Sequence, residues 1–159
     1  MAHKSQGSEL YVLDTTVSPV AVLKISLVTN ISGIGGTAGK IDTTTLDDLR
    51  YKRSMSGLID SGAASVGVLF DFSNDGQDFL HNNAGGENFQ FAVGEALDFG
   101  TPPTVNGSDN GFELPTTRSW LTFEASVSAN SIDIAMDDVW KVSSALQVSG
   151  EIVKTPAST

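Results

Sequence analysis

Hydrophobic and polar residues alternate with a period of two in several stretches of this chain, a pattern typical of β-strands with one buried and one wet face. The clearest run is 118–129, where Leu121, Phe123 and Ala125 alternate with polar residues. A shorter run, residues 9–14, is rich in residues that favour strands. The predicted strands cover residues 9–14, 20–29, 64–72, 88–95, 118–129 and 140–153.

One short helix is predicted between the third and fourth of these strands. Ser73 or Asn74 can cap its start, and acidic residues in its first turn would lie near the positive end of the helix dipole. Phe79 and Leu80 would anchor the helix to a core. The asparagines and glycines of residues 82–86 would end it.

A long polar segment, residues 40–57, lies between the second and third predicted strands. It follows a glycine-rich stretch at 30–39, predicted to be a flexible connection, and it ends at residues 56–62, predicted to form a turn. Loops of more than about 12 residues are uncommon in compact domains and usually have a function. We therefore predict a functional loop, and its charged residues are the candidate site residues: Lys40, Asp42, Asp47, Asp48, Arg50, Lys52 and Arg53.

Three other segments have no strand or helix pattern. Residues 1–7 are predicted to be a flexible N-terminal arm and residues 154–159 a flexible C-terminal tail. Residues 98–117 contain prolines and Asn-Gly pairs, which predict an irregular, exposed insertion. The remaining chain predicts one domain, residues 8–153. Its fold class is mainly β: an antiparallel β-sandwich or half-barrel with one short α-helix.

Composition and charge narrow the range of functions. A chain of 159 residues can bury a core, and the absence of cysteine excludes disulfides, thiolate metal sites and thiol nucleophiles. A net charge of −10 disfavours binding to nucleic acid, because binding through phosphates requires Lys and Arg. The start of the chain has no apolar signal segment, and no apolar run is long enough for a membrane helix. We expect a soluble protein made in the cytoplasm, with no membrane partner.

Two apparent ligand-binding motifs fail on spacing. Residues 33–40 suggest a phosphate-binding loop, but Ile34 stands where its first glycine belongs and Ile41 where its Ser or Thr belongs. Residues 71–76 imitate the first half of a calcium loop, yet Asn82 occupies the position of the bidentate glutamate. A flexible linker and a helix cap explain these two segments better, so the sequence predicts no cofactor and no metal.

Candidate catalytic residues are also sparse. His3 and His81 are the two histidines, and their spacing supports neither a metal site nor a Ser-His-Asp arrangement. The pairs at residues 47–48 and 137–138 could supply two carboxylates for sugar hydrolysis. Both pairs lie among polar turn residues, so solvated charge is the simpler interpretation. The chain is therefore not predicted to be an enzyme.

Taken in order, these segments resemble the tail tube proteins, or major tail proteins, of long-tailed, lambda-like siphophages. The resemblance covers nearly the whole chain, residues 8–153. It departs from the family at the proline- and glycine-rich residues 100–111. The matching segments are Glu-Leu-Tyr-Val-Leu at 9–13, Lys-Ile-Asp-Thr-Thr-Thr-Leu-Asp-Asp at 40–48, Gly-Leu-Ile-Asp-Ser-Gly at 57–62, Asp-Phe-Ser-Asn-Asp-Gly at 71–76 with the short helix after it, and residues 120–150.

The resemblance implies a structural virion protein of the phage tail that is a subunit of a hexameric ring. In this family, β-sandwiches flanked by a helix close rings whose inner strands form a continuous barrel, and the rings stack into the tube through which DNA leaves the capsid. It implies that residues 40–57 reach an adjacent ring and that other tail proteins bind the tube ends. DNA would pass through the lumen without specific binding, which agrees with the acidic net charge. The basic residues of the loop could pair with a neighbour's Glu124, Asp133 or Asp137.

Two other functions stay open at the level of sequence. The first is a β-sandwich module that binds carbohydrate or another protein. Such a site usually presents aromatic residues on one sheet face, whereas Trp120 and Trp140 do not share a face in the predicted strands. The second is a hydrolase that uses Asp47 or Asp137.

Overall fold

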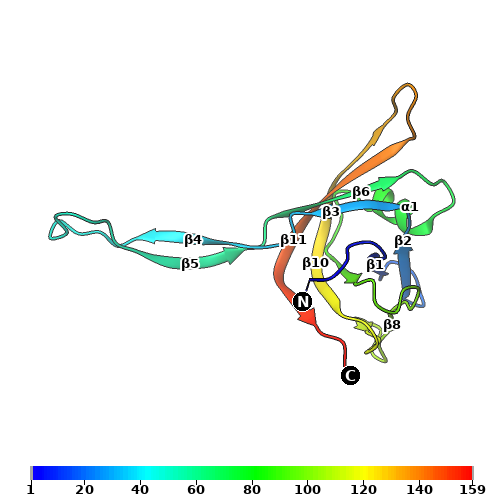
Figure 1. Ribbon diagram of the computed structural model, residues 1–159, viewed down its shortest axis with the longest axis horizontal. Helices are drawn as coiled ribbons and strands as arrows, with labels where there is room; N and C mark the ends of the chain where they lie inside the picture. Colours follow the sequence, from blue (N-terminus) through cyan, green and yellow to red (C-terminus); the bar gives the residue numbers. More distant parts are fainter. Residues whose placement is uncertain (1, 159) are drawn as a thin grey trace.

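The alternating stretches form one antiparallel sheet of seven strands in the computed structural model, which describes residues 2–158 (Figure 1). The order of strands across the sheet is β2-β1-β7-β10-β11-β6-β3. The prediction of a mainly β, antiparallel fold with one short helix is confirmed. The strands of this sheet are β1 Glu9–Asp14, β2 Ala21–Ile25, β3 Val28–Ser32, β6 Ala63–Leu69, β7 Phe89–Gly94, β10 Trp120–Asp133 and β11 Lys141–Thr155.

The two end strands of the sheet are neighbours in sequence. Residues 20–29 were predicted to form one strand, but they form β2 and the start of β3, separated by Ser26 and Leu27. Leu27 has a left-handed backbone, with φ 59, and turns the chain at this point. Because such a short link joins strands at opposite ends of the order, the sheet must curl until its two margins approach each other. This curvature is the half-barrel form of the predicted fold.

The core fills the concave side of the curled sheet. Buried side chains from six of its strands meet there, and α1 (Asp75–Asn82) closes the open side with Phe79 and Leu80. The predicted cap of this helix is confirmed, because the Asn74 side chain accepts a hydrogen bond from the Gln77 amide at 2.9 Å. No helix within residues 2–158 is long and apolar enough to cross a membrane. The largest core residues on the strands are Leu10, Ile25, Phe89, Phe91, Phe123 and Leu146.

The start of helix α1 also contacts the end of β2. The Asn74 side chain accepts from the Ser26 amide at 3.3 Å and donates to the Lys24 carbonyl at 3.2 Å. The Gln77 side chain donates to the Ser26 carbonyl at 3.0 Å. These side chains take the place of a further strand at Lys24 and Ser26, so they satisfy backbone groups at the end of β2.

Gly76 allows this close approach of helix to strand. A Cβ atom at residue 76 would lie 2.4 Å from the Lys24 carbonyl oxygen. We expect Gly76→Ala to lower the free energy of unfolding by about 1–3 kcal/mol, because the helix must move off the strand. Gly107→Ala is the matched control, since a Cβ there meets nothing within 4 Å. Urea denaturation followed by circular dichroism measures both, and equal stability of the two variants would contradict this packing role.

The insertion at 98–117 covers the convex side of the sheet. It was predicted to be irregular and exposed, but it contains a short hairpin, β8 (Thr104–Val105) and β9 (Phe112–Glu113). Phe112 and Leu114 pack on Tyr11, Ala92 and Trp120, which form a second, smaller core. The Trp120 indole donates to the Pro115 carbonyl at 2.9 Å. The insertion therefore shields large aromatic side chains that face away from the main core.

The chain ends make specific contacts. In the predicted C-terminal tail, β11 continues to Thr155, and the amides of Ala157 and Ser158 donate to Ser119 Oγ at 3.1 Å and to the Thr116 carbonyl at 2.9 Å. In the predicted N-terminal arm, His3 Nδ1 lies 2.7 Å from Glu95 Oε2. Residues 1 and 159 of these two segments lie outside the described residues.

Candidate assembly site

The predicted functional loop is a β-hairpin that projects from the body of the molecule (Figure 1). Its strands, β4 (Thr37–Asp42) and β5 (Ser54–Asp60), form a separate two-stranded sheet. The predictions of a loop over 40–57, a flexible connection over 30–39 and a turn over 56–62 are wrong where these strands lie. Neither face of the hairpin is buried, so the strands carry no alternation of hydrophobic and polar residues to reveal them.

The hairpin tip, residues 43–53, is held by hydrogen bonds from its own residues. Thr44 Oγ1 accepts from the Arg53 amide at 2.9 Å, and Asp42 Oδ1 accepts from the Thr44 amide at 2.9 Å. Asp48 Oδ2 accepts from the Thr45 amide at 2.9 Å, and Asp48 Oδ1 lies 2.8 Å from Arg53 Nε. Hydrogen bonds from the hydroxyl and amide of Thr44 lower the pKa of the Asp42 carboxyl. The tip thus has a defined shape that β4 and β5 carry away from the sheet.

The structure separates the seven predicted site residues into two groups. Asp48 and Arg53 are brought together as an ion pair inside the tip, and Asp42 bonds to Thr44. The remaining four are exposed, and none of them forms an ion pair within residues 2–158: Lys40 on β4, and Asp47, Arg50 and Lys52 on the tip. Three of the seven therefore shape the tip, and four remain available to another molecule.

The same hairpin also exposes apolar side chains that were not predicted from the sequence to be site residues. Leu46 is 100% and Leu49 is 92% exposed at the tip, beside an exposed Tyr51. The strands add Ile41, Met55, Leu58 and Ile59. The sequence does contain a sign of this surface, because several large apolar residues lie within residues 40–57, a segment in which only the charged residues were taken as candidates. Clustered apolar groups that the chain itself leaves uncovered mark an interaction surface.

Two sheet edges next to this hairpin are also open. β3 bonds to β6 on one side only. β11 pairs with β6 no further than Gln147; Val148 and Gly150 still bond to Gly62 and Ser61, and residues 151–155 have β10 as their only neighbouring strand. A groove lies along that part of β11, at the base of the hairpin. Its apolar lining residues are Ile34, Ile59, Leu121 and Ile152.

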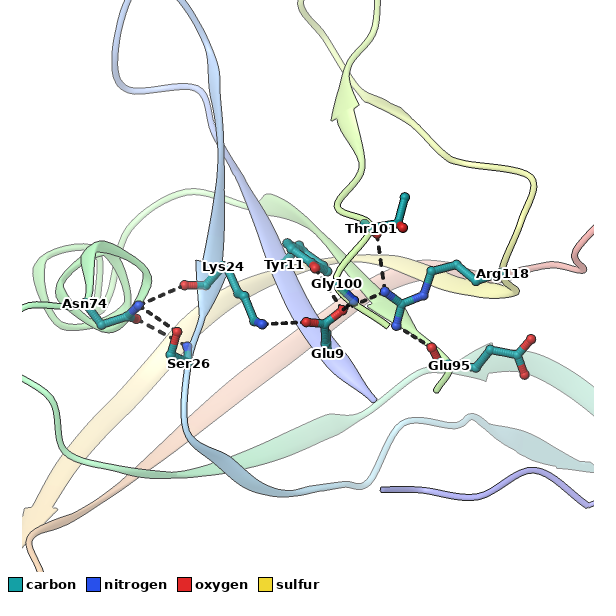
Figure 2. A network of polar contacts seen from close by, with 9 residues as sticks. All are labelled: Glu9, Tyr11, Lys24, Ser26, Asn74, Glu95, Gly100, Thr101 and Arg118. Carbon is teal, nitrogen blue, oxygen red and sulfur yellow. Dashed lines mark hydrogen bonds and ion pairs between the residues drawn. The ribbon is translucent and has the colours of Figure 1, made fainter. Parts of the chain in front are cut away.

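A buried charged cluster surrounds Glu9 on β1 (Figure 2). Arg118 is 0% and Glu9 is 4% exposed, and Arg118 Nη1 donates to Glu9 Oε2 at 2.6 Å. Arg118 also donates to the carbonyls of Glu95 and Thr101, and Lys24 Nζ contacts Glu9 Oε1. The cluster joins β1, β2 and the insertion. Solvent does not reach the Glu9 carboxylate, so it cannot act on a dissolved substrate.

The surroundings of this cluster suit a permanent charge pair. Burial alone would raise the pKa of Glu9, but hydrogen bonds from Arg118, Lys24, the Gly100 amide and Tyr11 lower it to about 2. Burial and the neighbouring negative charge of Glu9 raise the pKa of Tyr11 to about 12. A Cβ at residue 94 would lie 2.6 Å from the Arg118 guanidinium carbon, so only glycine leaves room for it. These features indicate a structural clamp.

The carboxylate pairs considered from the sequence do not form an active site. Asp47-Asp48 lies on the hairpin tip, where Asp48 is paired with Arg53. Asp137-Asp138 lies on the turn between β10 and β11, where Asp138 Oδ2 accepts from Lys141 Nζ at 2.8 Å. Among residues 2–158, no group of three His, Cys, Asp or Glu side chains could hold a metal ion.

The comparison with known families decides the identity. The chain matches the family described as "Phage tail tube, TTP, lambda-like" over residues 1–158. The chain belongs to this family. It is a tail tube subunit of a phage tail, a structural and non-enzymatic component of the virion, as the resemblance implied. Membership of a tail tube family also implies self-assembly into a tube.

Individual relatives support this assignment to the tail tube family. "Structural protein 3" of Pseudomonas phage PAJU2 is 32% identical over 164 residues, covering 98% of this chain and 95% of that protein. The SPP1 tail tube has the same fold, with a TM-score of 0.67 at 11% identity over 98% of this chain and 80% of that chain. A chain of the anti-feeding prophage baseplate, solved with six-fold symmetry, gives 0.63 at 8% identity over 100% and 97%.

Proposed function

We propose that this tail tube subunit joins copies of itself in two directions. Six copies close a ring through open strand edges, and rings stack when the β4–β5 hairpin of one copy contacts a copy in the next ring. The six-fold symmetry described for the anti-feeding prophage baseplate supports the number of copies. The observation that carries the proposal is the projecting hairpin, whose apolar side chains are uncovered in the single chain.

Open edges on both sides of the sheet support ring closure. On one side, β3 and residues 151–155 of β11 lack a second neighbouring strand. On the other side, β10 pairs with β7 no further than Ala125, and beyond the bond from the Gly85 amide to the Val127 carbonyl no strand continues along it. The end of the β2 edge at Lys24 is not available, because the Asn74 side chain at the start of α1 bonds to it. A head-to-tail ring requires two different complementary surfaces on each copy, and edges left open in this way can bind a strand from a neighbour.

Charge supports the proposed role of the tube as a conduit for DNA. With a net charge of −10 the subunit repels phosphates, so DNA passes through the bore without specific binding. The hairpin residues Lys40, Asp42, Asp47, Asp48, Arg50, Lys52 and Arg53 serve stacking in this proposal. At the two ends of the tube the same surfaces have no further copy to contact, and other tail proteins would bind there.

Electron microscopy of the concentrated, purified chain tests the proposal. We expect hollow filaments built of rings with six-fold symmetry, formed without cofactor or metal. Dilution should return the subunits to solution, which analytical ultracentrifugation measures. A chain that stays monomeric at every concentration and instead binds a glycan would refute the proposal and favour a binding module.

A further inference from the structure

Two hairpins extend from opposite ends of one strand, β6. The β4–β5 hairpin joins the Ala63 end of β6 through Ser61 and Gly62. At the other end Leu69 pairs with Lys141, the first residue of β11, so the turn between β10 and β11 lies there. We call this turn, residues 134–140, the distal turn. Figure 1 shows that the two hairpins leave the body in different directions.

The distal turn carries an apolar surface of its own. Met136 is 92% exposed at the turn, and Ile134 and Val139 are exposed beside it. At its base, Trp140 lies with its ring centre 5.7 Å from that of Phe72, which is 75% exposed. Aromatic and methionine side chains are enriched at the centres of protein interfaces. This surface has the same general composition as the hairpin tip but a different charge.

The charges on the two surfaces are complementary. The hairpin tip offers Arg50 and Lys52, whose side chains form no ion pair within the described chain. The distal turn and the residue before it offer Asp133 and Asp137, whose carboxylates are likewise without an ion pair in residues 2–158. Opposite charges around matching apolar groups orient two surfaces and favour their association.

We propose that the distal turn is the surface that receives the hairpin tip of another copy. The inference rests on the proposed function, in which the β4–β5 hairpin contacts a second copy, and it identifies the receiving surface. Leu46, Leu49 and Tyr51 pack against the Met136 and Phe72 surface, while Arg50 and Lys52 pair with Asp133 and Asp137. Because the donor and receiver lie at opposite ends of β6, each copy uses both surfaces, and in the proposed stack of rings the contact repeats head to tail along the tube axis. Such a repeat gives axial growth.

Charge reversal tests this contact. The hairpin variant carries Arg50→Glu with Lys52→Glu. The turn variant carries Asp133→Lys with Asp137→Asn, because residue 137 has φ 56 and asparagine tolerates that backbone. Each variant is expected to raise the protein concentration needed for filaments about tenfold or more, since like charges then face each other. The variant with all four changes is expected to recover most of the assembly.

The outcomes separate this inference from the proposed function. If the hairpin variant fails to assemble while the turn variant assembles normally, the hairpin acts on another surface, and only the inference is refuted. If neither pair of changes alters assembly, the inference fails. The proposed function is then tested separately by removing the hairpin tip with its apolar residues Leu46, Leu49 and Tyr51. Failure of the combined variant to recover, with unchanged circular dichroism, also refutes direct pairing. Thermal unfolding of all three variants should match the wild type, because these side chains are exposed.

Discussion

Replacing the hairpin tip, residues 43–53, by Asn-Gly should leave a folded subunit that forms no filaments. Asp42 and Ser54 are paired at the end of the hairpin, so a two-residue Asn-Gly turn can connect them without disturbing β4 or β5. The change removes Leu46, Leu49 and the basic residues that the subunit leaves exposed. Because these residues contribute nothing to the core, circular dichroism and thermal unfolding should be unchanged. Electron microscopy and sedimentation would report the loss of assembly.

A second exposed turn provides the matched control. Val105 and Phe112 are paired at the end of the β8–β9 hairpin, so residues 106–111 can also be replaced by Asn-Gly. This variant should retain filaments, because its turn belongs to the insertion on the convex side of the sheet. If the variant shortened at 43–53 assembles as well as this control, the assigned role of the β4–β5 hairpin is wrong.

Glu9→Gln should lower the free energy of unfolding more than Gly76→Ala or Asp138→Asn does. The change leaves the fully buried Arg118 guanidinium without its negative partner and leaves Lys24 without an ion pair. Breaking a buried ion pair by removing one partner costs about 3–5 kcal/mol. Asp138→Asn removes the exposed pair with Lys141 and should have little effect. Chemical denaturation measures the free energy of unfolding of both variants. Equal effects would contradict the stabilising role of the buried Glu9–Arg118 pair.

The same carboxylate predicts a pH dependence. The pKa of Glu9 falls from 4.5 to about 2 on folding, so its contribution is complete above pH 4.5 and is lost as the pH decreases toward 2. A shift of this size corresponds to about 3 kcal/mol. The free energy of unfolding of the wild type should therefore decrease over this interval more steeply than that of Glu9→Gln. Parallel pH profiles would show that Glu9 is not the group responsible.

The sequence predicts elements that carry a local pattern. β7 and β10 alternate because large apolar side chains from each point into the main core, whereas β1 is buried on both faces and was predicted from its strand-forming residues. Asn74 is a recognisable cap because capping depends on local hydrogen bonds. The break at Leu27 was missed because the apolar residues at odd positions from Ala21 continue to Leu27 itself, although the chain changes direction there. A left-handed leucine has no sequence signal comparable to glycine.

The sequence drew attention to residues 40–57 through their length and charges, and their role in stacking stays a prediction. The strands β4 and β5 within this segment were not recognised, because a hairpin buried on neither face lacks the alternation that reveals strands. Arg118 lay in a predicted strand with no indication that it is fully buried against Glu9, since their contact joins residues far apart in the chain. Pairings over such separations are set by the sheet order.

The most direct measurement is a cryo-EM reconstruction of filaments formed by the full-length chain. We expect six-fold rings in which the β4–β5 hairpin of each subunit leaves its own sheet and ends on the distal turn of a subunit in the adjacent ring. Lateral contacts should lie at the open edges of β3, β10 and β11. A reconstruction in which the hairpin packs against its own subunit, with those edges exposed to solvent, would contradict this arrangement.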